Sequence, residues 1–134
     1  MLQKKQPLTP SIEDYLETIY VLDKDHNGVR SIDVASALNV SKPSVNKALR
    51  NLVNAGLANQ EKYSLIHLTD IGREKAKEII TRHETIKEFL LNVLQVPEST
   101  AENEACMIEH SMSNETVTKM REFLNVCSKN IKKK

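Results

Sequence analysis

The sequence predicts a mainly α-helical protein with one short β-hairpin, from its composition and from its hydrophobic periodicity. The 134 residues include only three Gly and four Pro, and aromatic residues make up 4%. So few chain-breaking residues favour helices, and so few aromatic residues disfavour an all-β sandwich or a surface that stacks nucleic-acid bases. The length suits one domain, or a small domain plus an appendage.

Charge, cysteine content and hydropathy exclude several classes of protein. The formal net charge is +1, and two cysteines are too few for a disulfide framework. No apolar stretch approaches the roughly 20 residues that span a bilayer. The polar, lysine-containing segment 1–10 does not look like a secretory signal. We therefore expect a cytoplasmic protein with no membrane partner.

Apolar residues at helical spacing predict five or six helices. The first is expected to be opened by Thr9-Pro10-Ser11 and ended by His26-Asn27-Gly28. Two shorter helices, capped by Ser31 and Ser41, are expected before Gly56. The buried face of the first helix is expected to contain Ile12, Tyr15, Leu16, Ile19 and Leu22.

The second half of the chain is expected to begin with the hairpin and to continue in helices. Short apolar runs at 57–58 and 64–68 predict its two strands. Thr69 is expected to cap a long helix, and two more helices are expected near 99–111 and 114–127.

Residues 35–45 have the spacing of a helix-turn-helix. Ala35 is small where the two helices would cross, and Leu38 and Val45 would fill the space between them. Basic and amide side chains lie opposite the apolar face of the second helix, as in a helix that reads the major groove. The hairpin and helix that follow complete the layout of a winged helix. The predicted DNA contacts are Lys42, Ser44, Asn46, Lys47, Arg50 and Lys62.

Charge is distributed unevenly along the chain. Residues 30–56 carry a net charge of +3, whereas residues 83–115 carry −6. The N-terminal half is therefore expected to favour anions and the C-terminal half cations. The alternative for the N-terminal half is an ordinary helical hairpin with a solvated basic face.

Several side chains of the chain are potential metal ligands: Asp14, Glu17, His83, Cys106, Glu109 and His110. The first two are three residues apart on the first helix. The last three lie at positions i, i+3 and i+4 and so share one helical face. His83 lies in the apolar stripe of its own predicted helix, where a buried imidazole needs a hydrogen-bonding or charged partner. Together they could surround one pocket, although the acidic pair could instead complement a helix dipole and the histidine could be an ordinary core residue.

The sequence resembles the diphtheria-toxin-repressor/manganese-transport-regulator family of metal-dependent transcriptional repressors. The resemblance runs from about residue 9 to residue 125. The segments that carry it are Thr9 to Tyr20, the winged helix, Arg82-His83-Glu84 and Cys106-x-x-Glu109-His110.

The resemblance implies a homodimer with two domains. Residues 1–74 would form the winged-helix DNA-binding domain, and residues 75–134 a helical metal-binding and dimerisation domain, without the SH3-like domain of longer relatives. A divalent metal would bind between the two, at the six candidate ligands named above.

The chain differs from both branches of that family. It resembles the manganese branch at Asp14, where the iron branch has a thioether, and the iron branch at Cys106, where the manganese branch has a carboxylate. The ancillary site of the iron branch uses a carboxylate and a histidine at positions that Lys87 and Glu102 occupy here. We therefore expect that ancillary site to be absent in its usual form.

The sequence thus predicts a metal-dependent repressor that binds a palindromic DNA operator. Carboxylate ligands suit Mn(II), and the thiol favours Fe(II), Co(II) or Zn(II). We expect Mn(II) or Fe(II) as the co-repressor, with Zn(II) or Co(II) able to bind in vitro. A metal-independent winged-helix regulator is the alternative. We expect neither an enzyme nor a small-molecule substrate, because no catalytic motif accompanies the ligands.

Overall fold

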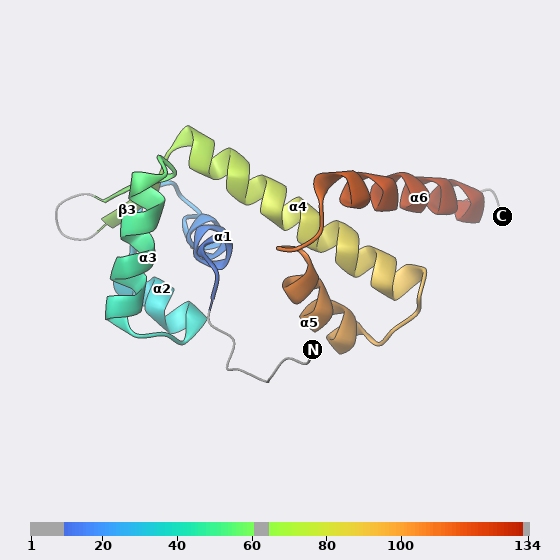
Figure 1. Cartoon of the computed structure of the whole chain (residues 1–134), viewed down its shortest axis with the longest axis horizontal. Helices are drawn as coiled ribbons and strands as arrows, with labels where there is room; N and C mark the ends of the chain where they lie inside the picture. Colours follow the sequence, from blue (N-terminus) through green and yellow to red (C-terminus); the bar gives the residue numbers. More distant parts are fainter. Residues whose placement is uncertain (1–9, 61–64, 133–134) are drawn as a thin grey trace. The chain divides into compact units, whose positions relative to one another are not determined.

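The computed structural model describes residues 10–60 and 65–132, and the predicted mainly helical fold is confirmed (Figure 1). In order, the described elements are α1 (Ile12–Leu22), β1 (Val29–Arg30), α2 (Ser31–Leu38), α3 (Lys42–Asn54), β2 (Ala58–Gln60), β3 (Leu65–Leu68), α4 (Asp70–Asn92), α5 (Glu98–Ile108) and α6 (Asn114–Lys132). The chain forms two compact units, of which one ends at Lys77 and the other begins at Glu78. Both this division and the predicted one after residue 74 lie within α4.

The first unit packs α1, α2 and α3 with a three-stranded antiparallel sheet of order β1-β3-β2. In the register of the sheet, Val29 is opposite Ile66 and Ala58 is opposite Leu68. The core contains Leu16, Ile19, Val34, Val45, Leu52 and Ile66, all at most 1% exposed.

Three side-chain caps define where the helices of this unit begin. The Ser11 hydroxyl accepts from the backbone N–H of Asp14, and the Ser41 hydroxyl accepts from that of Ser44. Thr69 caps α4 in the same way, through the N–H of Gly72. Each cap satisfies a donor that the first turn of a helix leaves without an intrahelical partner. These three predicted helix starts are confirmed.

The structure corrects three expectations about the first unit. Its sheet has a third strand, β1, which the sequence analysis missed because two residues carry no periodicity. Ser31 is the first residue of α2, and Arg30 takes the cap position. Ile12 and Leu22, the first and last residues of α1, are each 37% exposed and so lie outside the buried face.

The second unit has its own apolar core between α5, α6 and the C-terminal half of α4 (Figure 1). The buried residues of this core are Ile86, Leu90, Ala101, Ala105 and Val117. The Phe89 ring of α4 also contacts the Phe123 ring of α6, with the ring centroids 5.9 Å apart. None of the described helices is long and apolar enough to cross a membrane.

Candidate metal centre and nucleic-acid interface

The helix α3 separates an apolar face from a polar face, as predicted for a recognition helix. Val45, Ala48, Leu49 and Leu52 are buried against the unit. The predicted DNA-contacting residues on the same helix are exposed: Lys42, Ser44, Asn46, Lys47 and Arg50. The sixth predicted contact, Lys62, lies outside the described residues. This face can present charge and amide groups to a phosphate backbone or to base edges.

Ser44 has a local role in addition to its exposure. Its hydroxyl lies 2.9 Å from the hydroxyl of Ser41, which also accepts the Ser44 N–H at 3.2 Å. The Ser44 side chain therefore takes part in the N-terminal cap of α3.

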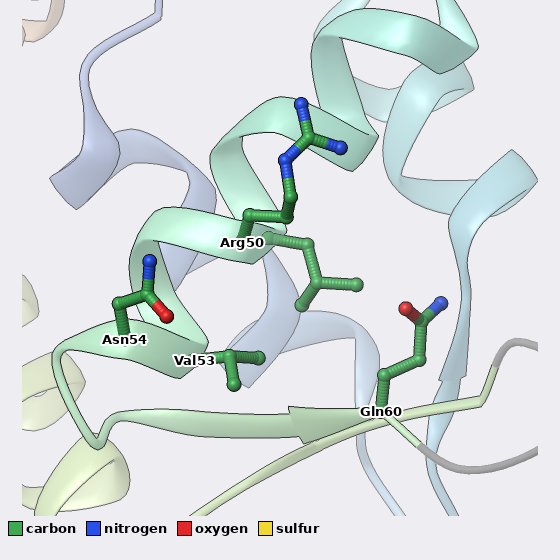
Figure 2. A pocket seen from close by; sticks show the side chains of 5 residues that line it. Arg50, Val53, Asn54 and Gln60 are labelled. Atoms are coloured by element: carbon green, nitrogen blue, oxygen red, sulfur yellow. The ribbon is translucent and has the colours of Figure 1, made fainter.

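A cavity of about 260 Å³ lies between α3 and β2. It is lined by Leu49, Arg50, Val53 and Asn54 from the helix and by Gln60 from the strand. Figure 2 shows Gln60 projecting from β2 on the side of α3, with Arg50, Val53 and Asn54 along the helix. The sequence analysis did not single out Gln60, because its place beside the helix depends on how β2 pairs.

His83 of α4 contacts two carboxylates of the helical unit, one at each ring nitrogen. Its Nδ1 lies 2.7 Å from Oε1 of Glu109, and its Nε2 lies 3.1 Å from Oε1 of Glu102. Glu109 is 1% exposed, and the His83 side chain is 13% exposed. The hydrogen bond to Glu109 raises the pKa of His83 to about 9, against the effect of burial. The partner that the sequence analysis required for this imidazole is therefore a pair of carboxylates.

The thiol of Cys106 lies close to the same imidazole. Its Sγ is 3.8 Å from Nδ1 of His83 and 3.8 Å from Oε2 of Glu102. Glu102 lies one turn before Cys106 on α5, so their side chains share a face of that helix. The hydrogen bond to His83 lowers the pKa of Glu102, and Lys87 acts in the same direction through a contact of 3.1 Å.

His110 lies on the other side of the Glu109 carboxylate. Its Nε2 is 3.4 Å from Oε2 of Glu109, whereas His83 takes Oε1. One buried carboxylate is thus shared by two imidazoles. Imidazole nitrogens, carboxylate oxygens and a thiol are the donors that first-row divalent metals bind in proteins. The donor set of this unit therefore fits a divalent transition metal.

The Arg82 guanidinium fixes the backbone around these ligands. It donates from Nε and Nη2 to the carbonyl oxygen of Glu109, at 3.0 and 2.6 Å. It also donates to the carbonyl of Met112 and to the side-chain amide oxygen of Asn114. The last carbonyls of a helix lack intrahelical partners, and a guanidinium can satisfy several at once. The end of α5 and the start of α6 are thereby held to α4.

Asp14 and Glu17 are half-buried residues of α1, in the first unit. Oδ2 of Asp14 accepts the Ser11 N–H at 2.9 Å and so completes a capping box. Asp14 thus takes part in the N-terminal cap of α1. The other four predicted ligands, His83, Cys106, Glu109 and His110, lie together in the second unit.

Comparison with known proteins agrees with this division into units. A family model described as iron dependent repressor, N-terminal DNA binding domain, matches residues 7–66. A second, described as iron dependent repressor, metal binding and dimerisation domain, matches residues 69–134. The chain belongs to the iron-dependent repressor family. Its dimerisation domain indicates a homodimer, and the family consists of transcriptional regulators, which are not enzymes.

Two curated relatives can be aligned with most of the chain. An uncharacterized HTH-type transcriptional regulator of Methanocaldococcus jannaschii is 39% identical over 87% of the chain and 94% of the relative. The HTH-type transcriptional regulator MntR of Lysinibacillus sphaericus is 34% identical over 91% of the chain and 87% of the relative. The resemblance to the manganese-transport-regulator family is therefore confirmed.

Solved structures of metal-dependent regulators have the same fold. The manganese regulator SloR superposes with a TM-score of 0.78 at 30% identity over 88% of this chain. A manganese-dependent transcriptional repressor in complex with manganese gives 0.77 at 26% identity over 86%. This chain spans about half the length of these structures, 55% and 53% respectively. It is thus a metal-responsive, DNA-binding regulator of the repressor family.

Proposed function

We propose that this repressor uses Mn(II) or Fe(II) as its co-repressor and binds a palindromic operator as a homodimer. The observation that carries the proposal is the buried Glu109 carboxylate, which has one imidazole at each oxygen and a thiol nearby. An ionised carboxylate is costly to bury unless cationic groups or a metal compensate it.

The proposed ligands of the regulatory metal are the six predicted residues: Asp14, Glu17, His83, Cys106, Glu109 and His110. The contacts among the last four support their grouping. Asp14 and Glu17 are assigned by the family resemblance. The capping bond of Asp14 engages Oδ2 of its carboxylate.

Each unit has a separate part in the proposed mechanism. The carboxylates of the proposed ligand set repel one another when no cation is present. When bound, a divalent cation supplies the positive charge that offsets this repulsion and links residues of both units. Linkage of this kind favours the arrangement that binds DNA. A hundredfold gain in operator affinity corresponds to about 2.7 kcal/mol of differential metal binding.

The exposed face of α3 supplies the proposed contacts with DNA. Lys42, Lys47 and Arg50 are assigned mainly to phosphates, and Ser44, Asn46 and Lys47 to positions nearest the base edges. Lys62 belongs to the same proposed set. A homodimer would present two such helices, and twofold symmetry makes a palindrome the matching DNA sequence.

An operator-binding assay tests the proposal. A duplex is selected from a random pool by the Mn(II)-loaded protein, and its affinity is then measured with Mn(II), with Fe(II) and with a chelator. We expect at least tenfold weaker binding with the chelator. Equal affinity in all three conditions would show that the repressor does not use a metal co-repressor.

Two substitutions on the same stretch of the chain form a matched pair for this assay. Glu109→Gln removes a proposed ligand charge, whereas Glu104→Gln makes the same change at an exposed position of α5. The metal response should be lost in the first variant and kept in the second. Loss of the response in both would indicate a general effect of acidic charge.

A further inference from the structure

We propose that Arg73 is a positioning residue that makes operator binding respond to the metal. It lies in the first turn of α4, at the point where the ends of α1 and α3 are both joined to that helix. Arg73 belongs neither to the proposed ligand set nor to the proposed DNA contacts. The inference rests on the function proposed above, because it concerns how the regulatory metal acts on the DNA-binding unit.

The Arg73 side chain joins α4 to the end of α1. Its Nη1 lies 2.7 Å from Nδ1 of His26, and its Nη2 lies 3.8 Å from Oδ2 of Asp23. A guanidinium only donates hydrogen bonds, so the histidine nitrogen accepts. Asp23 is the C-cap residue of α1, and His26 lies in the loop that follows. One side chain of α4 thus holds two points of the segment between α1 and β1.

The carboxylate that pairs with Arg73 is buried. The Asp23 side chain is 1% exposed, whereas that of Arg73 is 24% exposed. Oδ1 of Asp23 accepts the backbone N–H of Gly28 at 3.1 Å, and Oδ2 has no hydrogen-bond partner within the part of the chain that the structure describes. A buried carboxylate is costly unless positive charge lies near it. Arg73 supplies that charge, so a neutral side chain in its place would weaken the junction.

Thr69 joins the start of α4 to the end of α3. Its hydroxyl donates to the carbonyl of Gly56 at 2.8 Å, and its N–H donates to the carbonyl of Leu57 at 3.0 Å. Gly56 and Leu57 directly follow Ala55, the C-cap residue of the proposed recognition helix. The start of α4 is therefore held to the end of α3 by Thr69 and to the end of α1 by Arg73.

This junction can carry the restraint that a metal imposes. α4 is one helix of 23 residues that begins in the DNA-binding unit and continues into the helical unit. His83 follows Arg73 by about 15 Å along the helix axis. In the proposed mechanism the metal ties His83 to its ligands on α1. That restraint orients α3 only if α1, α3 and the start of α4 move as one body. Without Arg73, α4 is held at Thr69 alone and is free to pivot there.

Operator affinity measured with Mn(II) and with a chelator tests Arg73, and the ratio of the two affinities is the metal response. In Arg73→Gln we expect this ratio to fall by about fivefold or more, while the affinity with the chelator stays within about twofold of wild type. Lys77→Gln removes an exposed positive charge from the same helix and should keep the wild-type ratio. Equal losses of affinity in both conditions would show a merely structural role and would overturn the proposal.

Asp23→Asn tests the same contact from its other side. The variant keeps an acceptor for the Gly28 N–H and removes the charge that pairs with Arg73, so its metal response should fall as in Arg73→Gln. Asp25→Asn, at an exposed position of the same loop, is the control. Asp23→Asn decides the question if Arg73→Gln does not fold. The double variant should lose no more response than either single one, because both act through one contact. Additive losses would overturn the pairing.

Metal binding to the DNA-free protein separates this proposal from the function on which it rests. Arg73→Gln should bind Mn(II) with an affinity within about twofold of wild type, because Arg73 is outside the ligand set. In the wild type, operator DNA should strengthen Mn(II) binding by the same factor as Mn(II) strengthens operator binding, and the variant should lose this reciprocal gain. A wild type without metal response would overturn the proposed function and this inference with it. A wild type that responds, with an equal response in Arg73→Gln, would overturn only the role of Arg73.

Discussion

Nδ1 of His83 and Oε1 of Glu109 are 2.7 Å apart, and this contact joins α4 to the end of α5 inside the helical unit. Glu109 is 1% exposed, and its second oxygen faces His110. A buried carboxylate between two imidazoles is costly without positive charge. A proton on His83, whose pKa the contact with Glu109 raises to about 9, supplies part of that charge.

The stability of the metal-free protein should therefore decrease as pH rises. The pKa of His83 is about 9 in the folded chain and 6.5 in its ordinary state, so the folded protein binds this proton more tightly. The stabilisation is complete below pH 6.5 and is lost as pH rises through about 9. Urea unfolding of chelator-treated protein across this range measures it. A His83→Gln variant should show a flatter profile; an unchanged profile would exclude the His83 proton as the cause.

Arg82→Lys should destabilise the helical unit although it keeps the charge. The guanidinium reaches the carbonyls of Glu109 and Met112 together, and an ammonium cannot reproduce this planar set of donors. We expect a loss of about 1–3 kcal/mol in the free energy of unfolding, from hydrogen bonds made by a charged group. Thermal unfolding measures the loss. Lys77→Arg, an exposed change on the same helix, is the control, and equal stability of the two variants would contradict the role of Arg82.

Gly72→Ala should destabilise the DNA-binding unit strongly. An added Cβ would lie 2.0 Å from the carbonyl oxygen of Leu57, which the Thr69 N–H holds at 3.0 Å. Backbone must therefore shift, with a cost of about 1–3 kcal/mol or more. Gly56→Ala is the comparison: nothing lies within 4 Å of its Cβ, and only its φ of +78° opposes the change, at about 1–2 kcal/mol. Denaturant unfolding should rank Gly72→Ala as the less stable; the reverse order would contradict the clash.

Lys47→Ala should weaken operator binding and reduce its dependence on salt. Lys47 is exposed on α3, and each lysine paired with a phosphate contributes about one unit to the slope of log affinity against log salt. Lys119→Ala removes the same charge from an exposed position of α6 and serves as the control. Binding is measured at several salt concentrations. A slope that is unchanged in Lys47→Ala, or equally reduced in Lys119→Ala, would remove Lys47 from the DNA interface.

Much of the fold could be predicted because local chemistry determines it. The caps at Ser11, Ser41 and Thr69 are local hydrogen bonds, and the apolar periodicity of α3 separates its buried face from its exposed face. Strand β1 could not be predicted, because two residues become a strand only when β3 pairs with them. The exposure of Ile12 likewise depends on which neighbours reach the end of α1.

The sequence by itself determined the candidate donors of the helical unit, since Cys106, Glu109 and His110 lie within five residues of one another. The predicted common helical face is not formed as such, because α5 ends at Ile108 and Glu109 and His110 follow it. Only the tertiary structure decided which carboxylates contact which imidazole and ammonium groups. Packing of α4 against α5 places His83 between Glu109 and Glu102, and it brings Lys87 to the same carboxylate. These pairs are 15 to 26 residues apart in the chain. No helical period relates them, so their contacts arise from burial of the shared apolar core.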